Sequence, residues 1–133
     1  MIRSIGAVLA GYVAMAVVVV LATKLAVKLM FAEAPPGGMP APTGSYLIVN
    51  LLYSFAAAML GGWITARIAS SSPLGHAAAL AGFALLMAVV SSLAGPQAQG
   101  QPAWYPWVIG LLGAAGVLAG GWLRAAGQLP AQA

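Results

Sequence analysis

The chain has 133 residues, of which 62% are hydrophobic and only 5% are charged, whereas a soluble domain carries about 25% charged residues. Together with a mean hydropathy of +0.99, this composition indicates an integral membrane protein and excludes a soluble enzyme, a disordered chain and a disulfide scaffold. The net charge of +4 comes from five scattered Lys and Arg side chains, too few for a nucleic-acid partner.

Four stretches are long and apolar enough to cross a bilayer, which requires about 20 mostly apolar residues. The first runs from about Ile5 to Thr23, and its helix can continue to Phe31. The others run from about Tyr46 to Ile68, from about His76 to Leu93 and from about Trp104 to Leu123. We therefore expect an all-α, integral membrane four-helix bundle, with residues 1–133 forming one transmembrane domain.

Pro- and Gly-rich segments separate the expected spans, at residues 34–44, 70–75 and 95–102. Proline lacks the amide donor that a helix interior needs, and glycine is conformationally free. Ser72 or Pro73 is expected to start the third helix, and Pro106 fits a first helical turn. The apolar run after Arg3 exceeds the roughly 7–15 residues of a signal-peptide core, so we expect an uncleaved first span.

The distribution of basic residues predicts the orientation. With four spans, Arg3, Arg67 and Arg124 lie on one side of the membrane, and Lys24 and Lys28 lie on the other with Glu33. The side richer in Lys and Arg is normally cytoplasmic. We therefore expect a multi-pass protein of the cell inner (plasma) membrane with both termini in the cytoplasm.

Aromatic side chains mark the depth of the membrane interfaces, because amphipathic rings prefer the headgroup level. One predicted interface holds Tyr46, Trp104, Tyr105 and Trp107, and the other holds Trp63 and Trp122. Arg67 follows Trp63 by four residues, so both lie on one helix face. A cation–π contact and independent anchoring both fit this spacing.

The chain contains an apparent internal repeat. Residues 9–12 (LAGY) match residues 80–83 (LAGF), and residues 61–63 (GGW) match residues 120–122. We interpret this as two tandem helical hairpins, at about 4–69 and about 73–126. A hairpin contains an even number of spans, so both copies would insert in parallel orientation. Chance identity between apolar segments is the alternative.

The side chains needed for catalysis are almost absent. Glu33 is the only carboxylate side chain and His76 the only imidazole, and they are expected on opposite sides of the membrane. Acid–base pairs, catalytic triads and metal sites all need more of these groups. We therefore expect no enzyme activity and no cofactor. Haem held by His76 from two subunits is a minor alternative.

Lys24 and Lys28 lie one turn apart at the outer end of the first span. Their long stems can extend to the headgroups as simple anchors. The alternative is a lipid or anion contact that also uses the region of Tyr46.

Polar residues inside the spans are candidates for interhelical hydrogen bonds or for a pore or substrate site. In the second span these are Asn50, Tyr53 and Ser54. Ser91, with Ser92 beside it, lies near the end of the third span and is expected to face them. Interhelical hydrogen bonding explains such groups without a substrate.

Small residues predict the helix-packing surfaces. Gly116 and Gly120 form a small-xxx-small pair, and Ala57 and Gly61 occupy the matching positions of the repeat. Membrane helices associate through close backbone approach, which small residues allow. We expect both pairs to contact neighbouring helices, within the chain or across a dimer, whereas Val19 is expected to face lipid.

Three features carry a resemblance to a known class of proteins. These are the LAGY start at residues 9–12, the Pro-rich first loop and the GGW-x-x-AR ending at residues 61–67. In these features the chain resembles small uncharacterised four-span bacterial inner-membrane proteins. The resemblance implies a fold and a location, and it carries over no catalytic residues.

The sequence thus predicts a non-catalytic membrane protein that acts as a structural, accessory or lipid-interacting component. Its expected partners are membrane lipid, copies of itself or a larger membrane complex. The alternative is a small oligomeric transporter or channel.

Overall fold

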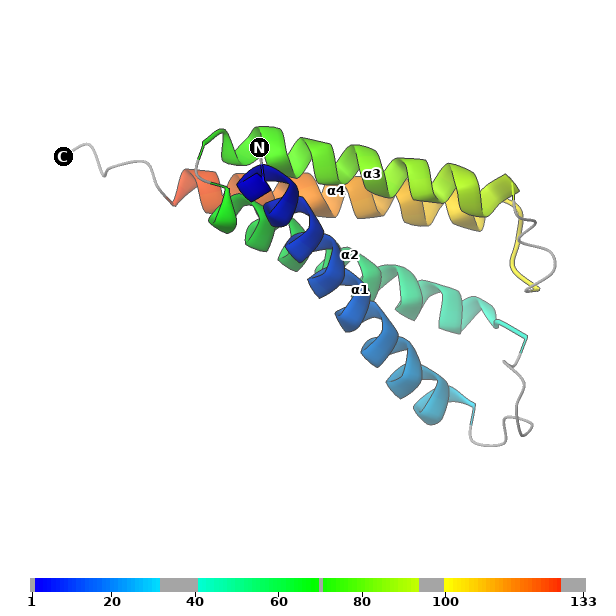
Figure 1. The fold of residues 1–133 in the computed structure, drawn as a ribbon. Coiled ribbons are helices and arrows are strands. Elements are labelled where there is room, and N and C mark those ends of the chain that lie inside the picture. The colour runs from blue at the N-terminus through cyan, green and yellow to red at the C-terminus, as the bar shows by residue number, and fades with distance from the viewer. Residues whose placement is uncertain (1, 32–40, 70, 94–99, 128–133) are drawn as a thin grey trace.

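The fold is that of a computed structural model, which describes residues 2–31, 41–69, 71–93 and 100–127. These ranges contain no strand, and they form the four helices α1 (Ile2–Met30), α2 (Gly44–Ile68), α3 (Pro73–Leu93) and α4 (Tyr105–Ala126) (Figure 1). Each helix is long and apolar enough to cross a membrane. The predicted all-α bundle of four membrane-spanning helices is confirmed. Glu33 and the side chain of Arg3 lie outside the described residues.

The helix ends follow local sequence signals. The side chain of Thr43 caps α2 by accepting a hydrogen bond from the backbone N–H of Tyr46 at 3.3 Å. Helix α3 begins at Pro73, and Pro106 lies in the first turn of α4. Proline fits a first turn because its missing N–H has no helical partner there. These two proline positions agree with the sequence-based expectation.

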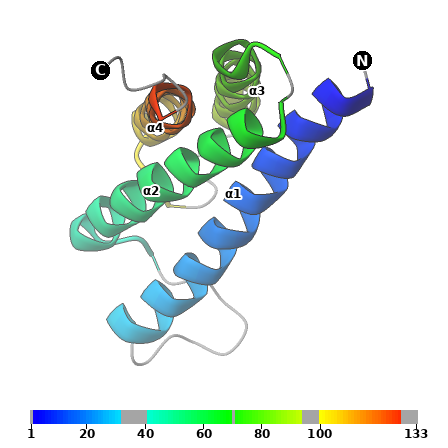
Figure 2. The same cartoon turned by 90° about the vertical axis from the view of Figure 1, so that its left-hand side faces the viewer.

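The four helices alternate in direction, and α1 begins at the end of the bundle where α4 ends (Figure 1). Helix α2 lies at the centre, with its most extensive contacts to α4 and α1, while α3 packs mainly on α4. Figure 2 looks along α3 and α4 and shows α1 and α2 crossing them at an angle. Helix α1 has 29 residues and spans about 43 Å at 1.5 Å per residue. Such a helix exceeds the roughly 30 Å hydrocarbon layer and is expected to tilt.

Two clusters of buried side chains hold the bundle together. The first joins all four helices near the end where they converge, with Leu80 and Val117 fully buried. The second joins α1, α2 and α4 near the opposite end, around Ala26, Tyr46 and Tyr105. Between these levels α3 separates from α1 (Figure 1).

The second cluster corrects two of the predicted interface anchors. Tyr46 and Tyr105 are only 7% and 4% exposed, because Tyr46 packs edge-on against Phe31 and Tyr105 faces α2. Trp104 and Trp107 are about half exposed, as anchors should be. A position near the end of a span therefore does not reveal whether a ring points outward or between helices.

Glycines bring the backbones of α2 and α4 into direct contact. A Cβ atom added to Gly120 would lie closer than 3.0 Å to the carbonyl oxygen of Met59, and one added to Gly62 would lie equally close to the carbonyl oxygen of Val117. The Cα hydrogen in each place therefore points at a carbonyl of the facing helix, the arrangement of a Cα–H···O contact. Gly116 adds a third approach, because a Cβ atom there would lie 2.9 Å from both the Cβ of Ala58 and the carbonyl oxygen of Phe55.

Helices α1 and α2 are also joined through small residues. A Cβ atom on Gly61 would lie 2.8 Å from the carbonyl oxygen of Gly11, and one on Gly11 would lie 2.6 Å from that of Gly61. Ala57, one turn earlier on α2, is 1% exposed. All four positions named from the small-residue pattern are thus buried between helices.

The two Gly-Gly pairs of the apparent repeat contact different neighbours. Gly61 meets α1 within its own hairpin, whereas its counterpart Gly120 meets α2 of the other hairpin. Gly121, not Gly120, is the residue that faces Ala77 of α3. The tandem repeat stays a prediction, because helix direction alone does not distinguish a duplication from an ordinary antiparallel bundle.

Candidate functional site

A network of polar side chains joins α1, α2 and α4 inside the apolar bundle. Asn50 is its centre: its Oδ1 accepts hydrogen bonds from Tyr105 Oη at 2.5 Å and from Ser54 Oγ at 3.3 Å. Its Nδ2 donates to Tyr53 Oη. Tyr53 Oη lies 2.8 Å from Thr23 Oγ1. Because Tyr53 accepts from Asn50, its own hydroxyl proton is free to donate to Thr23.

This network satisfies the hydrogen-bonding groups of a polar amide within a membrane span. An unpaired amide in hydrocarbon is strongly unfavourable, and here three hydroxyl side chains on α2 and α4 contact Asn50 directly. The sequence pattern indicated Asn50, Tyr53 and Ser54 but not Thr23 and Tyr105. Thr23 is near the end of its expected span, and Tyr105 looks like an interface anchor, so neither position signalled an interhelical partner.

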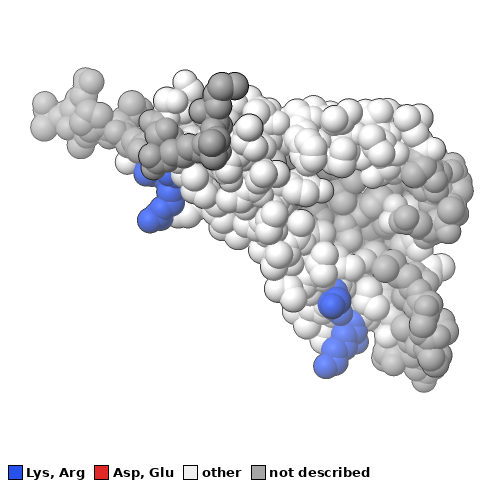
Figure 3. All heavy atoms as spheres, viewed as in Figure 1, with Lys and Arg blue, Asp and Glu red and all other residues white. Residues whose placement is uncertain are grey.

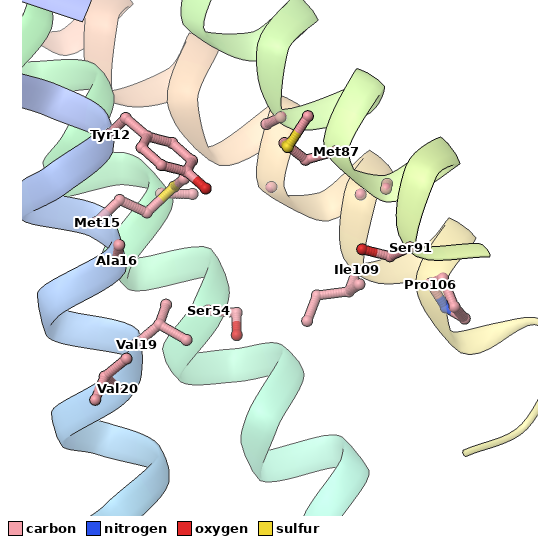
Figure 4. Close-up of a pocket in the computed structure, with 15 residues that line it drawn as sticks. Tyr12, Met15, Ala16, Val19, Val20, Ser54, Met87, Ser91, Pro106 and Ile109 are labelled. Atoms are coloured by element: carbon pink, nitrogen blue, oxygen red, sulfur yellow. The ribbon is translucent and has the colours of Figure 1, made fainter. Parts of the chain in front are cut away.

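A cavity of about 410 Å³ opens beside this network, between α1 and α3, with α2 and α4 as its floor (Figure 4). Its walls are almost entirely apolar, and six of its fifteen lining residues are Ala or Gly. These small side chains leave the space that Leu or Phe would fill. The lining residues are Tyr12, Met15, Ala16, Val19, Val20, Ser54, Ala58, Ala84, Met87, Ala88, Ser91, Pro106, Ile109, Gly110 and Gly113.

An aromatic pair lies at one end of the cavity, where Tyr12 is a lining residue. The rings of Tyr12 and Phe83 lie 5.0 Å apart at an interplanar angle of 87° and connect α1 to α3. Beyond this pair, toward the end of the bundle that carries Lys24, α1 and α3 diverge (Figure 1). The cavity therefore extends from the middle of the bundle toward one end.

Ser91 does not join the polar network. Its side chain is exposed and lines the cavity from α3, across from Ser54 on α2 (Figure 4). The neighbouring Ser92 donates to the carbonyl of Val89 in its own helix at 2.7 Å. Val19, expected to face lipid, is only partly exposed and lines the same cavity.

Basic side chains occupy separate places on the bundle. Lys24 and Lys28 are exposed near the end of α1, one turn apart. Arg67 and Arg124 lie in the last turns of α2 and α4, at the opposite end, and the guanidinium carbon of Arg67 is 5.0 Å from the ring centroid of Trp63. Figure 3 shows blue basic side chains in two groups with an uncharged surface between them.

His76 lies at the start of α3, where its Nδ1 is 3.0 Å from the carbonyl oxygen of Ser72. Ser72 has a positive φ of 46°, an unusual conformation for a serine, in the turn that joins α2 to α3. The His76 ring thus contacts the turn that precedes its own helix. Among the described residues, His, Cys, Asp and Glu form no group of three that could hold a metal ion.

Comparison with known proteins found no matching family model, no matching curated protein and no matching solved structure. The resemblance to small four-span bacterial membrane proteins therefore stays a prediction. The polar network, the cavity and the distribution of charge are the features that bear on function.

Proposed function

We propose that this protein is a small, non-catalytic component of the inner (plasma) membrane that works through lipid and through contacts with other membrane segments. The observation that carries the proposal is the polar network. Asn50, Tyr53 and Tyr105 are polar groups within the described spans, and their hydrogen-bonding atoms are directed at one another and not at a ligand site. Polar residues used in this way stabilise an assembly of helices.

The inventory of reactive side chains supports a role without catalysis. The sequence has no cysteine, one carboxylate side chain and one imidazole. His76 is the imidazole, and its Nδ1 faces a backbone carbonyl. A weak nucleophile is activated by an adjacent general base, a lowered pKa or a metal, and none of the described hydrogen bonds joins His76 to another side chain.

The orientation belongs to the same proposal, with both termini in the cytoplasm and the Lys24 end of the bundle outside. Fusions of a reporter after Ala133 and within residues 35–43 test it. The first fusion should give a cytoplasmic signal and the second an exported signal. The reverse pattern would overturn the orientation and leave the fold unaffected.

A small oligomeric transporter or channel is the second candidate. The cavity favours it, because the space is lined by the hydroxyl-bearing residues Tyr12, Ser54 and Ser91 and reaches the middle of the bundle. In the single chain the lining on α1 begins at Tyr12 and does not reach the start of the helix, so a complete path would need further subunits.

Purification in a mild detergent with mass determination separates the two candidates. Co-purification of different subunits, or of a single chain with bound lipid, is expected for the structural, accessory or lipid-interacting role. A stable homo-oligomer that carries solute flux after reconstitution into liposomes would overturn that role in favour of transport.

A further inference from the structure

We propose that the α1–α3 cavity is a binding site for one acyl chain of an anionic phospholipid whose headgroup lies on Lys24 and Lys28. This inference rests on the proposed lipid-interacting role and names the place and the lipid class. It is carried by the depth of the cavity, its apolar walls and the position of the two lysines beyond its open end.

The depth of the cavity matches one leaflet of a bilayer. On α1 the lining runs from Tyr12 to Val20, nine residues whose first and last Cα atoms lie about 12 Å apart along the axis. Half of a typical hydrocarbon core is about 15 Å. The aromatic pair of Tyr12 and Phe83 lies where an acyl chain in that leaflet would end, near the middle of α1 and α3.

The chemistry of the walls changes along the cavity as it does along a phospholipid. Met15 and Met87 line its deeper part from α1 and α3 (Figure 4), and methionine is a flexible side chain that adapts to chain-like ligands. Ser91 lines it in the last turn of α3, at the level where the ester groups of a lipid lie. The hydroxyl of Ser54 is already directed at Asn50, so it presents little unpaired polarity to an acyl chain.

The charge at the open end selects the headgroup. Lys24 follows Val20 of the cavity wall by one helical turn, about 6 Å along the axis, and Lys28 follows by a second turn. A helix turns about 100° per residue, so Lys24 and Lys28 lie about 40° and about 80° round α1 from Val20, on the outer side of the lining. Both side chains are exposed, and their long stems have to bend back toward the cavity to reach a phosphate at its edge. A headgroup with a net negative charge complements this pair better than a zwitterionic one.

Native mass spectrometry of the delipidated protein, titrated with palmitoyl-oleoyl phosphatidylglycerol or phosphatidylcholine, tests the proposal. We expect one phosphatidylglycerol to be retained in preference to phosphatidylcholine. Each basic side chain near a membrane surface contributes about fivefold in affinity. The double variant Lys24→Gln/Lys28→Gln should therefore reduce phosphatidylglycerol retention roughly five- to thirtyfold and leave phosphatidylcholine retention nearly unchanged.

The acyl-chain part of the site is tested by filling the cavity. A Cβ atom at Gly113, a lining residue, meets nothing within 4 Å, so Gly113→Leu should occupy the space without displacing a helix. Gly82 of α3 is equally open but is not part of the lining, which makes Gly82→Leu the matched control. We expect Gly113→Leu to lose the retained lipid at least tenfold and Gly82→Leu to keep it.

Equal lipid retention in Gly113→Leu and wild type would overturn the cavity as the site. Equal retention of the two lipids by the wild type would overturn the selection of an anionic headgroup by the two lysines. A dimer that Gly113→Leu dissociates, without bound lipid, would show that a second copy of the chain fills the space and would also overturn the proposal. Because the lysine pair is exposed, its variant reports on lipid selection even if Gly113→Leu fails to fold. The proposed function fails if a homo-oligomer carries solute flux, whereas the lipid proposal fails on the retention measurements alone. The two failures are therefore distinguishable.

Discussion

The contact between α2 and α4 makes Gly120 the position where the smallest side-chain addition should have the largest effect. In Gly120→Ala the new methyl group would lie closer than 3.0 Å to the backbone carbonyl oxygen of Met59, whereas ordinary van der Waals contact requires 3.4–4 Å. The obstacle is backbone and cannot rotate away. The two helices therefore have to separate.

The size of the effect follows from the interactions that this separation weakens. Overpacking of a well-packed interior costs about 1–3 kcal/mol, and each weakened Cα–H···O contact adds about 0.5–1 kcal/mol. The better helix propensity of alanine returns at most about 1 kcal/mol. We expect Gly120→Ala to lower the free energy of unfolding by about 2 kcal/mol, and Gly120→Leu to lower it further.

Gly113 on the same helix supplies the control, because a Cβ atom added there meets nothing within 4 Å. Gly113→Ala should leave the unfolding free energy unchanged or raise it by up to about 1 kcal/mol. Unfolding in mixed micelles of mild detergent and dodecyl sulfate, followed by circular dichroism, measures both variants. Equal stability of Gly120→Ala and Gly113→Ala would refute the backbone contact between α2 and α4.

Three further predictions use the same assay. The losses of unfolding free energy caused by Gly62→Ala and Gly120→Ala should be less than additive in the double variant, because either substitution already separates α2 from α4. Full additivity would mean that the two contacts are independent. Tyr105→Phe should lower the free energy of unfolding by about 0.6–1.7 kcal/mol, the range for one interhelical hydrogen bond in a membrane. Asn50→Ala should lower it further, because three hydroxyls lose their partner, and an unchanged stability of Asn50→Ala would contradict the network. Gly11→Ala should destabilise the bundle by about 1–3 kcal/mol, since its methyl group would collide with the α2 backbone, and an unchanged stability would exclude that α1–α2 contact.

The helices could be predicted from the sequence because bilayer thickness fixes how long an apolar stretch must be. Pro73 and Pro106 marked helix starts for a local reason, since proline is tolerated in a first turn. The structure extends α1 to residues 2–30, beyond the minimum span, because nothing in that sequence ends the helix before Met30. Local rules and membrane thickness thus determine where the helices lie.

The arrangement of the helices could be predicted only in part. The small residues Gly116 and Gly120 indicated a packing surface, but not that α2 would be the helix packed against it. Tyr105 was expected at the interface and is buried against Asn50 of α2, 55 positions away. Ser91 was expected beside Asn50, and α3 diverges from α1 and leaves it on the cavity wall. These outcomes depend on crossing angles, which the hydropathy pattern of a single helix does not contain.

The cavity had no sequence signal of its own. Alanine and glycine at Ala16, Ala88 and Gly113 look like packing residues in a linear sequence. Whether a small side chain admits a neighbouring helix or leaves space depends on where the helices cross. Here α2 and α4 approach closely while α1 and α3 separate. Small residues therefore allow close backbone contact between α2 and α4 and leave a cavity between α1 and α3.

Cysteine accessibility tests the membrane-spanning arrangement most directly, because the sequence contains no cysteine and every introduced thiol is unique. The exposed residues Ser45, Ser71 and Ala103 lie at helix ends, and Val17 is 52% exposed in the middle of α1. With an impermeant maleimide on intact cells, Ser45→Cys and Ala103→Cys should be labelled, Ser71→Cys should be labelled only after permeabilisation, and Val17→Cys should remain unlabelled. Labelling of both Ser45→Cys and Ser71→Cys in intact cells would show that α2 does not cross the membrane and would contradict the four-span bundle.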